Sequence, residues 1–105
     1  MKFPEIIDAL NQGEMCYRGG WNGMNMFVFR QVPSIIPASV VPNMTSLPQK
    51  VKDEFVRRFN SAEYQVNELH DTNQYCIVNS SNLINSWFPS VSDINSDDWQ
   101  IYKGI

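Results

Sequence analysis

The stretch MCYRGGWNGMNMFVFR, residues 15–30, decides the fold, because two β-favouring runs flank a glycine-rich turn. The runs MCYR and MFVFR carry the aromatic, branched and sulfur-containing side chains that suit strands. Asn22-Gly23 lies between them, and both residues tolerate the positive φ of a type I′ hairpin turn. We therefore predict a β-hairpin with Trp21 and Asn22 at its tip.

Two amphipathic helices are predicted on either side of this hairpin. Apolar residues recur at helical spacing over residues 3–10, Pro4 suits the first turn, and Gly13 would release the C-terminus. A second helix is predicted to open at 46–48, with apolar side chains at every fourth position from Leu47 to Phe59. We expect this second helix to pack across the sheet.

Further strand-like segments follow at residues 75–78, 83–88 and 99–102. Strands that run in succession, with two helices and no strict β-α alternation, are typical of an α+β fold with a mainly antiparallel sheet. A chain of 105 residues has room for one modest core, so we predict a single domain over 1–105. Residues 33–48 hold four prolines and are predicted to form a rigid excursion, and the polar segment 60–74 is predicted to be a surface loop.

Charge and composition exclude several classes of function. The net charge is −3, and no run of basic residues exceeds Arg57-Arg58, so we expect neither DNA nor RNA as a partner. No apolar run is long enough for a membrane span, and the acidic residues near the N-terminus argue against a signal peptide. Cys16 and Cys76 lack metal or redox spacing and are expected to be reduced core or strand residues.

Catalytic motifs are missing from the sequence. The only histidine, His70, has no obvious nucleophile beside it, and no phosphate-binding, zinc-protease or serine-hydrolase motif occurs. We therefore expect neither an enzyme nor a cofactor. The acidic segment 92–98 could hold a divalent metal ion, but its Ser, Asp and Asn residues also suit the cap of one short helical turn, and this second interpretation is favoured.

The three tryptophans and one arginine each suit either a structural role or a role in ligand binding. Trp99 alternates with Ile101 in a strand, which favours core packing, whereas Trp21 and Trp87 suit either packing or stacking on a nucleobase. Arg18 suits either the surface of a strand or a two-pronged contact with phosphate or carboxylate. The residues alone thus indicate a small α+β domain with several conspicuous aromatic side chains.

Two motifs in a fixed order give the chain a family resemblance. Residues 18–23 (RGGWNG) follow the first helix, and residues 86–93 (SWFPSVSD) precede the final DDW at 97–99. In these motifs the chain resembles the second Thoeris anti-defence family of phage proteins, from about residue 3 to residue 103. The family pattern commonly has lysine at the position of Met24, and the loss of that charge removes attraction for an anionic ligand.

The resemblance implies a sponge that acts in the host bacterial cytoplasm. Such proteins sequester cyclic ADP-ribose isomers, among them glycocyclic ADP-ribose, and some also take up cyclic dinucleotides of related systems such as CBASS. They leave the signal intact and assemble as homo-oligomers, commonly tetramers. Carried onto this chain, the ligand-binding residues would be Arg18 as an anchor, Trp21 and Trp87 as stacking faces, and Asn22, Ser90, Ser92 and Asp93 as hydrogen-bonding groups.

Two rival hypotheses place the protein in other functional classes, a protein–protein inhibitor and an enzyme. A subset of the family resembles anti-CRISPR proteins, so the chain could instead be a protein–protein inhibitor of a bacterial defence nuclease. A hydrolase of the signal would need a metal ion at Asp93, Asp97 and Asp98. Chelator-sensitive turnover would establish the hydrolase, and recovery of intact ligand would exclude it.

Overall fold

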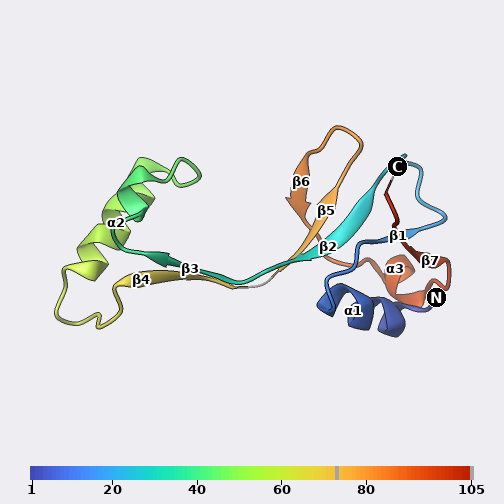
Figure 1. Ribbon diagram of the computed structural model, residues 1–105, viewed down its shortest axis with the longest axis horizontal. Helices are drawn as coiled ribbons and strands as arrows, with labels where there is room; N and C mark the ends of the chain where they lie inside the picture. The colour runs from blue at the N-terminus through green and yellow to red at the C-terminus, as the bar shows by residue number, and fades with distance from the viewer. Residues whose placement is uncertain (73, 105) are drawn as a thin grey trace. The chain divides into compact units, whose positions relative to one another are not determined.

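The computed structural model describes residues 1–72 and 74–104, which separate into two compact units (Figure 1). One unit, here the sheet unit, comprises residues 1–32 and 73–105. The other, here the insert unit, comprises residues 33–72. Helices and a mainly antiparallel sheet within one small chain confirm the predicted α+β class.

The sheet unit contains five antiparallel strands in the order β6-β5-β2-β1-β7. Their bounds are β1 Cys16–Arg18, β2 Phe27–Gln31, β5 Gln74–Val78, β6 Ile84–Ser86 and β7 Trp99–Ile101. The central strand β2 pairs along its whole length with β5, from Phe27 opposite Val78 to Gln31 opposite Gln74. Strand β1 pairs over three residues with β7 near the C-terminus, and this pairing brings Arg18 opposite Trp99.

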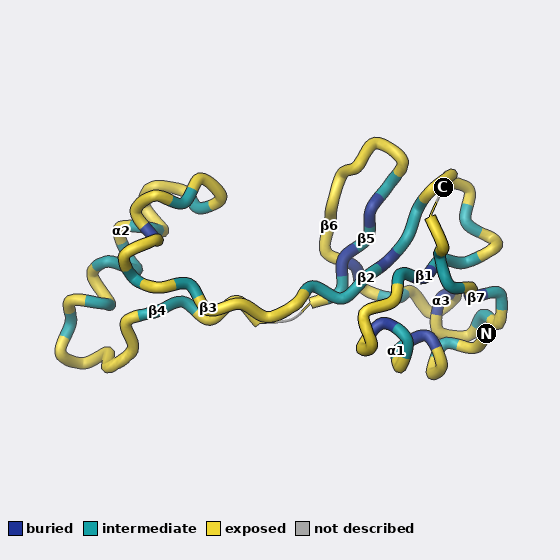
Figure 2. The backbone as a smooth tube through the Cα atoms, in the orientation of Figure 1, coloured by how far each residue is buried: buried dark blue, intermediate teal, exposed yellow. Residues whose placement is uncertain are grey.

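Helix α1, Phe3–Asn11, covers one face of this sheet. Its buried side chains Ile6 and Leu10 are four residues apart and pack with Cys16 and Val28, all with no exposed surface (Figure 2). The helix begins where the Lys2 amide donates to the Glu5 carboxylate, and the chain leaves it through a glycine with φ +93° at position 13. The predicted first helix and both predicted core cysteines are confirmed.

The opposite face of the sheet carries aromatic rings. Because neighbouring side chains in a strand point to opposite faces, Phe27 and Phe29 lie on the side away from buried Val28. Phe27 stacks on Tyr102 with ring centres 5.1 Å apart, and Tyr102 meets Tyr17 edge-on at 5.9 Å. We call Tyr17, Phe27, Phe29 and Tyr102 the aromatic face, and it borders the candidate site.

The connection between β1 and β2 corrects the predicted hairpin. The two strands share only the register pair Cys16 and Val28, and the positive φ in this loop, 58°, belongs to Asn25 and not to Asn22 or Gly23. The loop is therefore wide, and the predicted type I′ turn is wrong. The pairing of β1 with β2 stops after Cys16, while Tyr17 and Arg18 continue to pair with β7 on the other edge, so β1 and β2 diverge before the loop.

The insert unit contains more regular structure than the sequence indicated. Strands β3 (Ser34–Pro37) and β4 (Glu68–Asp71) form a two-stranded antiparallel sheet within the segments predicted as the 33–48 excursion and the 60–74 loop. The 3-10 turn η1, Val41–Asn43, also falls in the excursion. Local composition hid these strands, since each is completed by a partner about thirty residues away in the chain.

Helix α2, Gln49–Phe59, confirms the second predicted helix but not its predicted position across the main sheet. It belongs to the insert unit and lies against η1. Lys52 extends from the helix and donates to the carbonyls of Pro42 and Met44, which fixes the preceding turn. No helix in the described part of the chain is both long and apolar enough to cross a bilayer.

Candidate functional site

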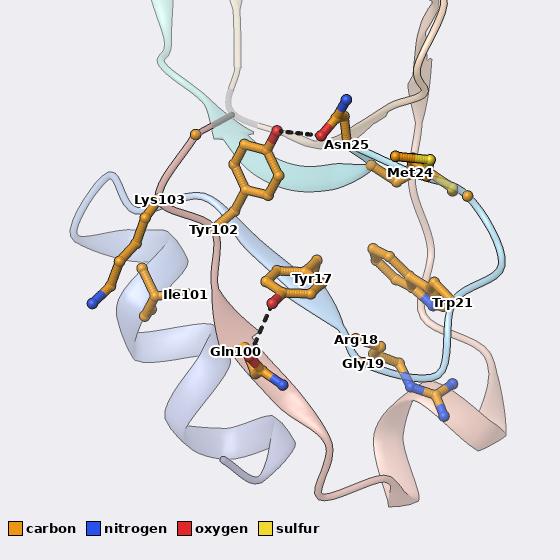
Figure 3. A pocket seen from close by; sticks show the side chains of 13 residues that line it. Tyr17, Arg18, Gly19, Trp21, Met24, Asn25, Gln100, Ile101, Tyr102 and Lys103 are labelled. Carbon is orange, nitrogen blue, oxygen red and sulfur yellow. Dashed lines mark hydrogen bonds between the residues drawn. The ribbon is translucent and has the colours of Figure 1, made fainter.

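An open pocket of about 580 Å³ lies in the sheet unit, between the loop 19–26 and strands β1 and β7 (Figure 3). This volume is within the usual range for small-molecule sites, about 300–1,000 Å³. The side chains that give the pocket its character are Tyr17, Trp21, Met24, Asn25, Gln100 and Tyr102. Strand pairing places the sheet residues, because Tyr17 lies directly opposite Gln100.

Aromatic rings form two sides of the pocket. Tyr17 and Tyr102 come from the aromatic face, and the indole of Trp21 reaches in from the loop (Figure 3). Trp21 is half-buried and packs edge-on against buried Trp99, with ring centres 5.3 Å apart. The Trp99 indole N–H in turn donates to the carbonyl of Asp93 at 2.9 Å. This chain of contacts holds the Trp21 ring in place before any ligand arrives.

Amide side chains supply the polar part of the pocket. The Tyr17 hydroxyl donates to Gln100 Oε1 at 2.9 Å, and the Tyr102 hydroxyl donates to Asn25 Oδ1 at 3.4 Å. In the parts of the chain that the structure describes, no group accepts a hydrogen bond from the amide nitrogen of Gln100 or Asn25. Both nitrogens can therefore donate to a ligand.

Arg18 lies at the edge of this pocket and is held by two carboxylates. Its Nε donates to Asp98 Oδ1 at 3.0 Å, and its Nη1 donates to Asp93 Oδ1 at 2.9 Å and to Ser92 Oγ at 3.3 Å. The Arg18 side chain is only 16% exposed. Asp98 also accepts from the Gly20 amide at 2.8 Å, so the cluster fixes the start of the loop.

Hydrogen bonds set the protonation of this cluster. The bonds from Arg18 lower the pKa of Asp98 below its ordinary value. Burial by itself raises the pKa of Asp93, but the Ser90 amide and the Arg18 guanidinium together outweigh burial, and the net pKa is lowered. The same two carboxylates raise the pKa of Arg18. One cation and two anions therefore share the cluster, with a formal charge of −1.

Helix α3, Val91–Asn95, positions Asp93 through a capping box. The Ser90 hydroxyl accepts from the Asp93 amide at 3.0 Å, and the Asp93 carboxylate accepts from the Ser90 amide at 2.9 Å. The short helical turn predicted at segment 92–98 is confirmed as α3, although its N-cap is Ser90, which precedes that segment. Among the described residues no group of three His, Cys, Asp or Glu side chains could hold a metal ion, and Asp93 and Asp98 are both engaged with Arg18.

The structure places the predicted ligand-binding residues in four different positions. Arg18, Ser90, Ser92 and Asp93 form one hydrogen-bonded network beside the pocket, and Trp21 lies in the pocket wall. Asn22 is exposed on the loop and is absent from the wall.

Trp87 lies in the core. Only 8% of it is exposed, and its ring packs against Phe3, Tyr75 and Trp99. Within this chain Trp87 offers little ring surface to a ligand. Of the two alternatives for this residue, core packing and stacking on a nucleobase, its position in the structure agrees with core packing. Its predicted role as a stacking face stays a prediction for any arrangement that uncovers the ring.

Sequence reasoning missed Tyr17, Gln100 and Tyr102 as pocket residues. Tyr17 could have been assigned to the face opposite Cys16 by the two-residue period of a strand. Its neighbours could not, because Tyr17 and Gln100 are 83 positions apart. The wall therefore exists only once β1 and β7 pair.

Fold and site together define a small α+β domain with a preformed, aromatic-walled pocket of ligand size. Residues 1–102 match the Thoeris anti-defense 2-like domain. The chain belongs to this family, and the family resemblance predicted from its two motifs is confirmed. It is also similar to the protein Thoeris anti-defense 2 of Bacillus phage SP01, with 32% identity over 101 residues, which is 96% of this chain and 93% of the phage protein. These findings support a phage anti-defence role.

Proposed function

We propose that the protein is a phage anti-defence sponge that binds and sequesters the nucleotide signals of its host. The ligands would be cyclic ADP-ribose isomers, glycocyclic ADP-ribose among them, and cyclic dinucleotides. Family membership supports the anti-defence role. The observation that carries the sponge mechanism is the pocket walled by Tyr17, Trp21 and Tyr102, since nucleobases stack on aromatic rings.

A sponge needs affinity and no chemistry. Holding a signal below the level that activates its receptor requires a Kd near 1 nM, which corresponds to about −12 kcal/mol. Stacking contributes about 1–3 kcal/mol per base. A pocket whose rings are already fixed, as Trp21 is on Trp99, saves the cost of ordering side chains on binding. On this proposal the ligand is bound intact.

The proposal extends to assembly and location. We expect a homo-oligomer, in particular a tetramer, that acts in the cytoplasm of the host bacterium, where the signal is made. Several copies would raise the local density of binding sites. Light scattering coupled to gel filtration measures the assembly directly, and a monomer at micromolar concentration would contradict this part of the proposal.

Calorimetry with glycocyclic ADP-ribose and with a cyclic dinucleotide tests the function. We expect tight binding to one or both, and recovery of unchanged ligand when the protein is denatured by heat. Trp21→Ala should weaken binding, whereas the matched control Phe88→Ala should not, because Phe88 is 85% exposed and lies outside the pocket. Recovery of a cleaved ligand, or no binding to either compound, would contradict the sponge.

A protein–protein inhibitor of a defence nuclease is the second candidate, and one surface feature favours it. Phe88, which precedes α3, is 85% exposed, and Val91, the first residue of α3, is 75% exposed. Ile94 in the same helix is also exposed. Exposed apolar side chains that gather in one segment often mark a protein interface. Co-purification with Cas9 that is lost in Phe88→Ala, without nucleotide binding, would favour this candidate.

A further inference from the structure

The positive charges around the pocket do not face a ligand. Two cations, Arg18 and Lys103, border it among the described residues. Arg18 is committed to Asp93 and Asp98, and the three groups together carry a formal charge of −1. In Figure 3 the guanidinium of Arg18 is turned away from Tyr102.

Lys103 is also directed elsewhere. Figure 3 shows its amine extending past Ile101, away from Tyr17 and Trp21. Ile101, the last residue of β7, packs against the core, whereas Tyr102 lines the pocket. The pocket interior is therefore lined by groups without a positive charge.

Uncharged groups in the pocket suit a planar heterocycle. Trp21 comes from the loop, while Tyr17 and Tyr102 come from the sheet, so the rings border the pocket on two sides. The amide nitrogens of Asn25 and Gln100 are free to donate to ring nitrogens, carbonyls or ribose hydroxyls. A phosphate in the same space would lose its hydration and approach a cluster of net negative charge.

We infer that this pocket takes the nucleobase and ribose end of the signal and leaves its phosphates in solvent. This inference rests on the proposed function and assigns the part of the ligand that the pocket recognises. It replaces the expectation that Arg18 anchors a phosphate. In the structure Arg18 instead positions the loop, since Asp98 bridges its guanidinium and the Gly20 amide.

Competition and salt dependence test the assignment. With glycocyclic ADP-ribose bound, adenosine should displace it, and inorganic pyrophosphate at the same concentration should not. The Kd should change by less than about threefold between about 0.1 M and 1 M NaCl, although the Debye length shortens from about 10 Å to about 3 Å. Displacement by pyrophosphate, or a steep loss of affinity with salt, would overturn the inference.

Two variants complete the test. Trp21→Ala should weaken adenosine and glycocyclic ADP-ribose alike, by about 5- to 150-fold, as expected for one lost base stack. Lys103→Ala should bind both compounds as the parent protein does, and a selective loss of glycocyclic ADP-ribose would overturn the inference while the sponge stands. If the parent protein binds neither a cyclic nucleotide nor adenosine, the proposed function itself fails. Thermal unfolding of each variant verifies that it is folded.

Discussion

Replacing Trp87 should damage folding, whereas replacing Trp21 should damage binding. Trp87 is 8% exposed and contacts three aromatic side chains of the core, while Trp21 is half-buried and contacts one of them, Trp99. Truncation of a buried tryptophan to alanine costs about 3–5 kcal/mol. Small domains have a total free energy of unfolding of about 5–15 kcal/mol, so Trp87→Ala removes a large share of it.

A milder pair of variants separates the two effects. Trp87→Phe keeps an aromatic ring in the core and should cost about 1–3 kcal/mol, which lowers Tm by roughly 5–20 °C in a domain of this size. Its ligand affinity should stay within about twofold of the parent value at a temperature where it is folded, because no direct contact is lost. Trp21→Phe should lower Tm less and reduce affinity more.

Urea unfolding followed by tryptophan fluorescence measures the first quantity, and calorimetry with glycocyclic ADP-ribose measures the second. The reasoning would be refuted if Trp87→Phe kept its stability but lost ligand binding. That result would show that Trp87 presents its ring to the ligand in an arrangement other than the one described.

Three further predictions concern the loop, the acidic cluster and the core thiols. Gly20→Ala should weaken ligand binding, because a Cβ there would lie 2.9 Å from the Asp98 carboxylate that holds the loop. Calorimetry compares this variant with the parent protein and with the exposed control Phe88→Ala, and an affinity equal to that of the parent would contradict the role of this contact. The lowered pKa of Asp93 contributes stability that is complete above the ordinary value of 3.8 and is lost as pH falls through the lower folded value. Asp93→Asn should therefore flatten the acid side of a plot of Tm against pH, and an unchanged slope would argue against the ion pair. Burial, with a smaller contribution from a nearby glutamate, raises the pKa of Cys16 to about 11. Iodoacetamide should therefore label this thiol slowly in the folded protein at pH 8 and quickly in urea. Rapid labelling of the folded form would show that the thiol is accessible.

Local signals predicted much of the fold. The apolar spacing of residues 3–10 predicted the first helix, and the Ser, Asp and Asn residues of segment 92–98 predicted a short helical turn where α3 lies. Both depend on contacts within four residues, which a sequence displays directly. The paired strands β3 and β4 escaped prediction because their hydrogen bonds join residues more than thirty positions apart.

The candidate site was predictable only in part. The two motifs identified Arg18, Trp21 and Asp93 as residues of interest, and the structure brings Arg18 and Asp93 together across 75 positions. The motifs could not show that this contact neutralises the arginine, nor that Trp87 turns into the core. Both facts depend on which partners the side chain meets, and those partners lie in distant segments.

By itself the sequence determined the two longer helices, the strand segments of the five-stranded sheet, the absence of a basic stripe for nucleic acid, and the family. Only the tertiary structure decided where a ligand could lie. The pairing of β1 with β7 sets Tyr17 beside Gln100, and the Asp98 carboxylate holds the loop that carries Trp21. Propensity and capping act over a few residues, whereas a pocket wall needs side chains that approach only after long-range strands have paired.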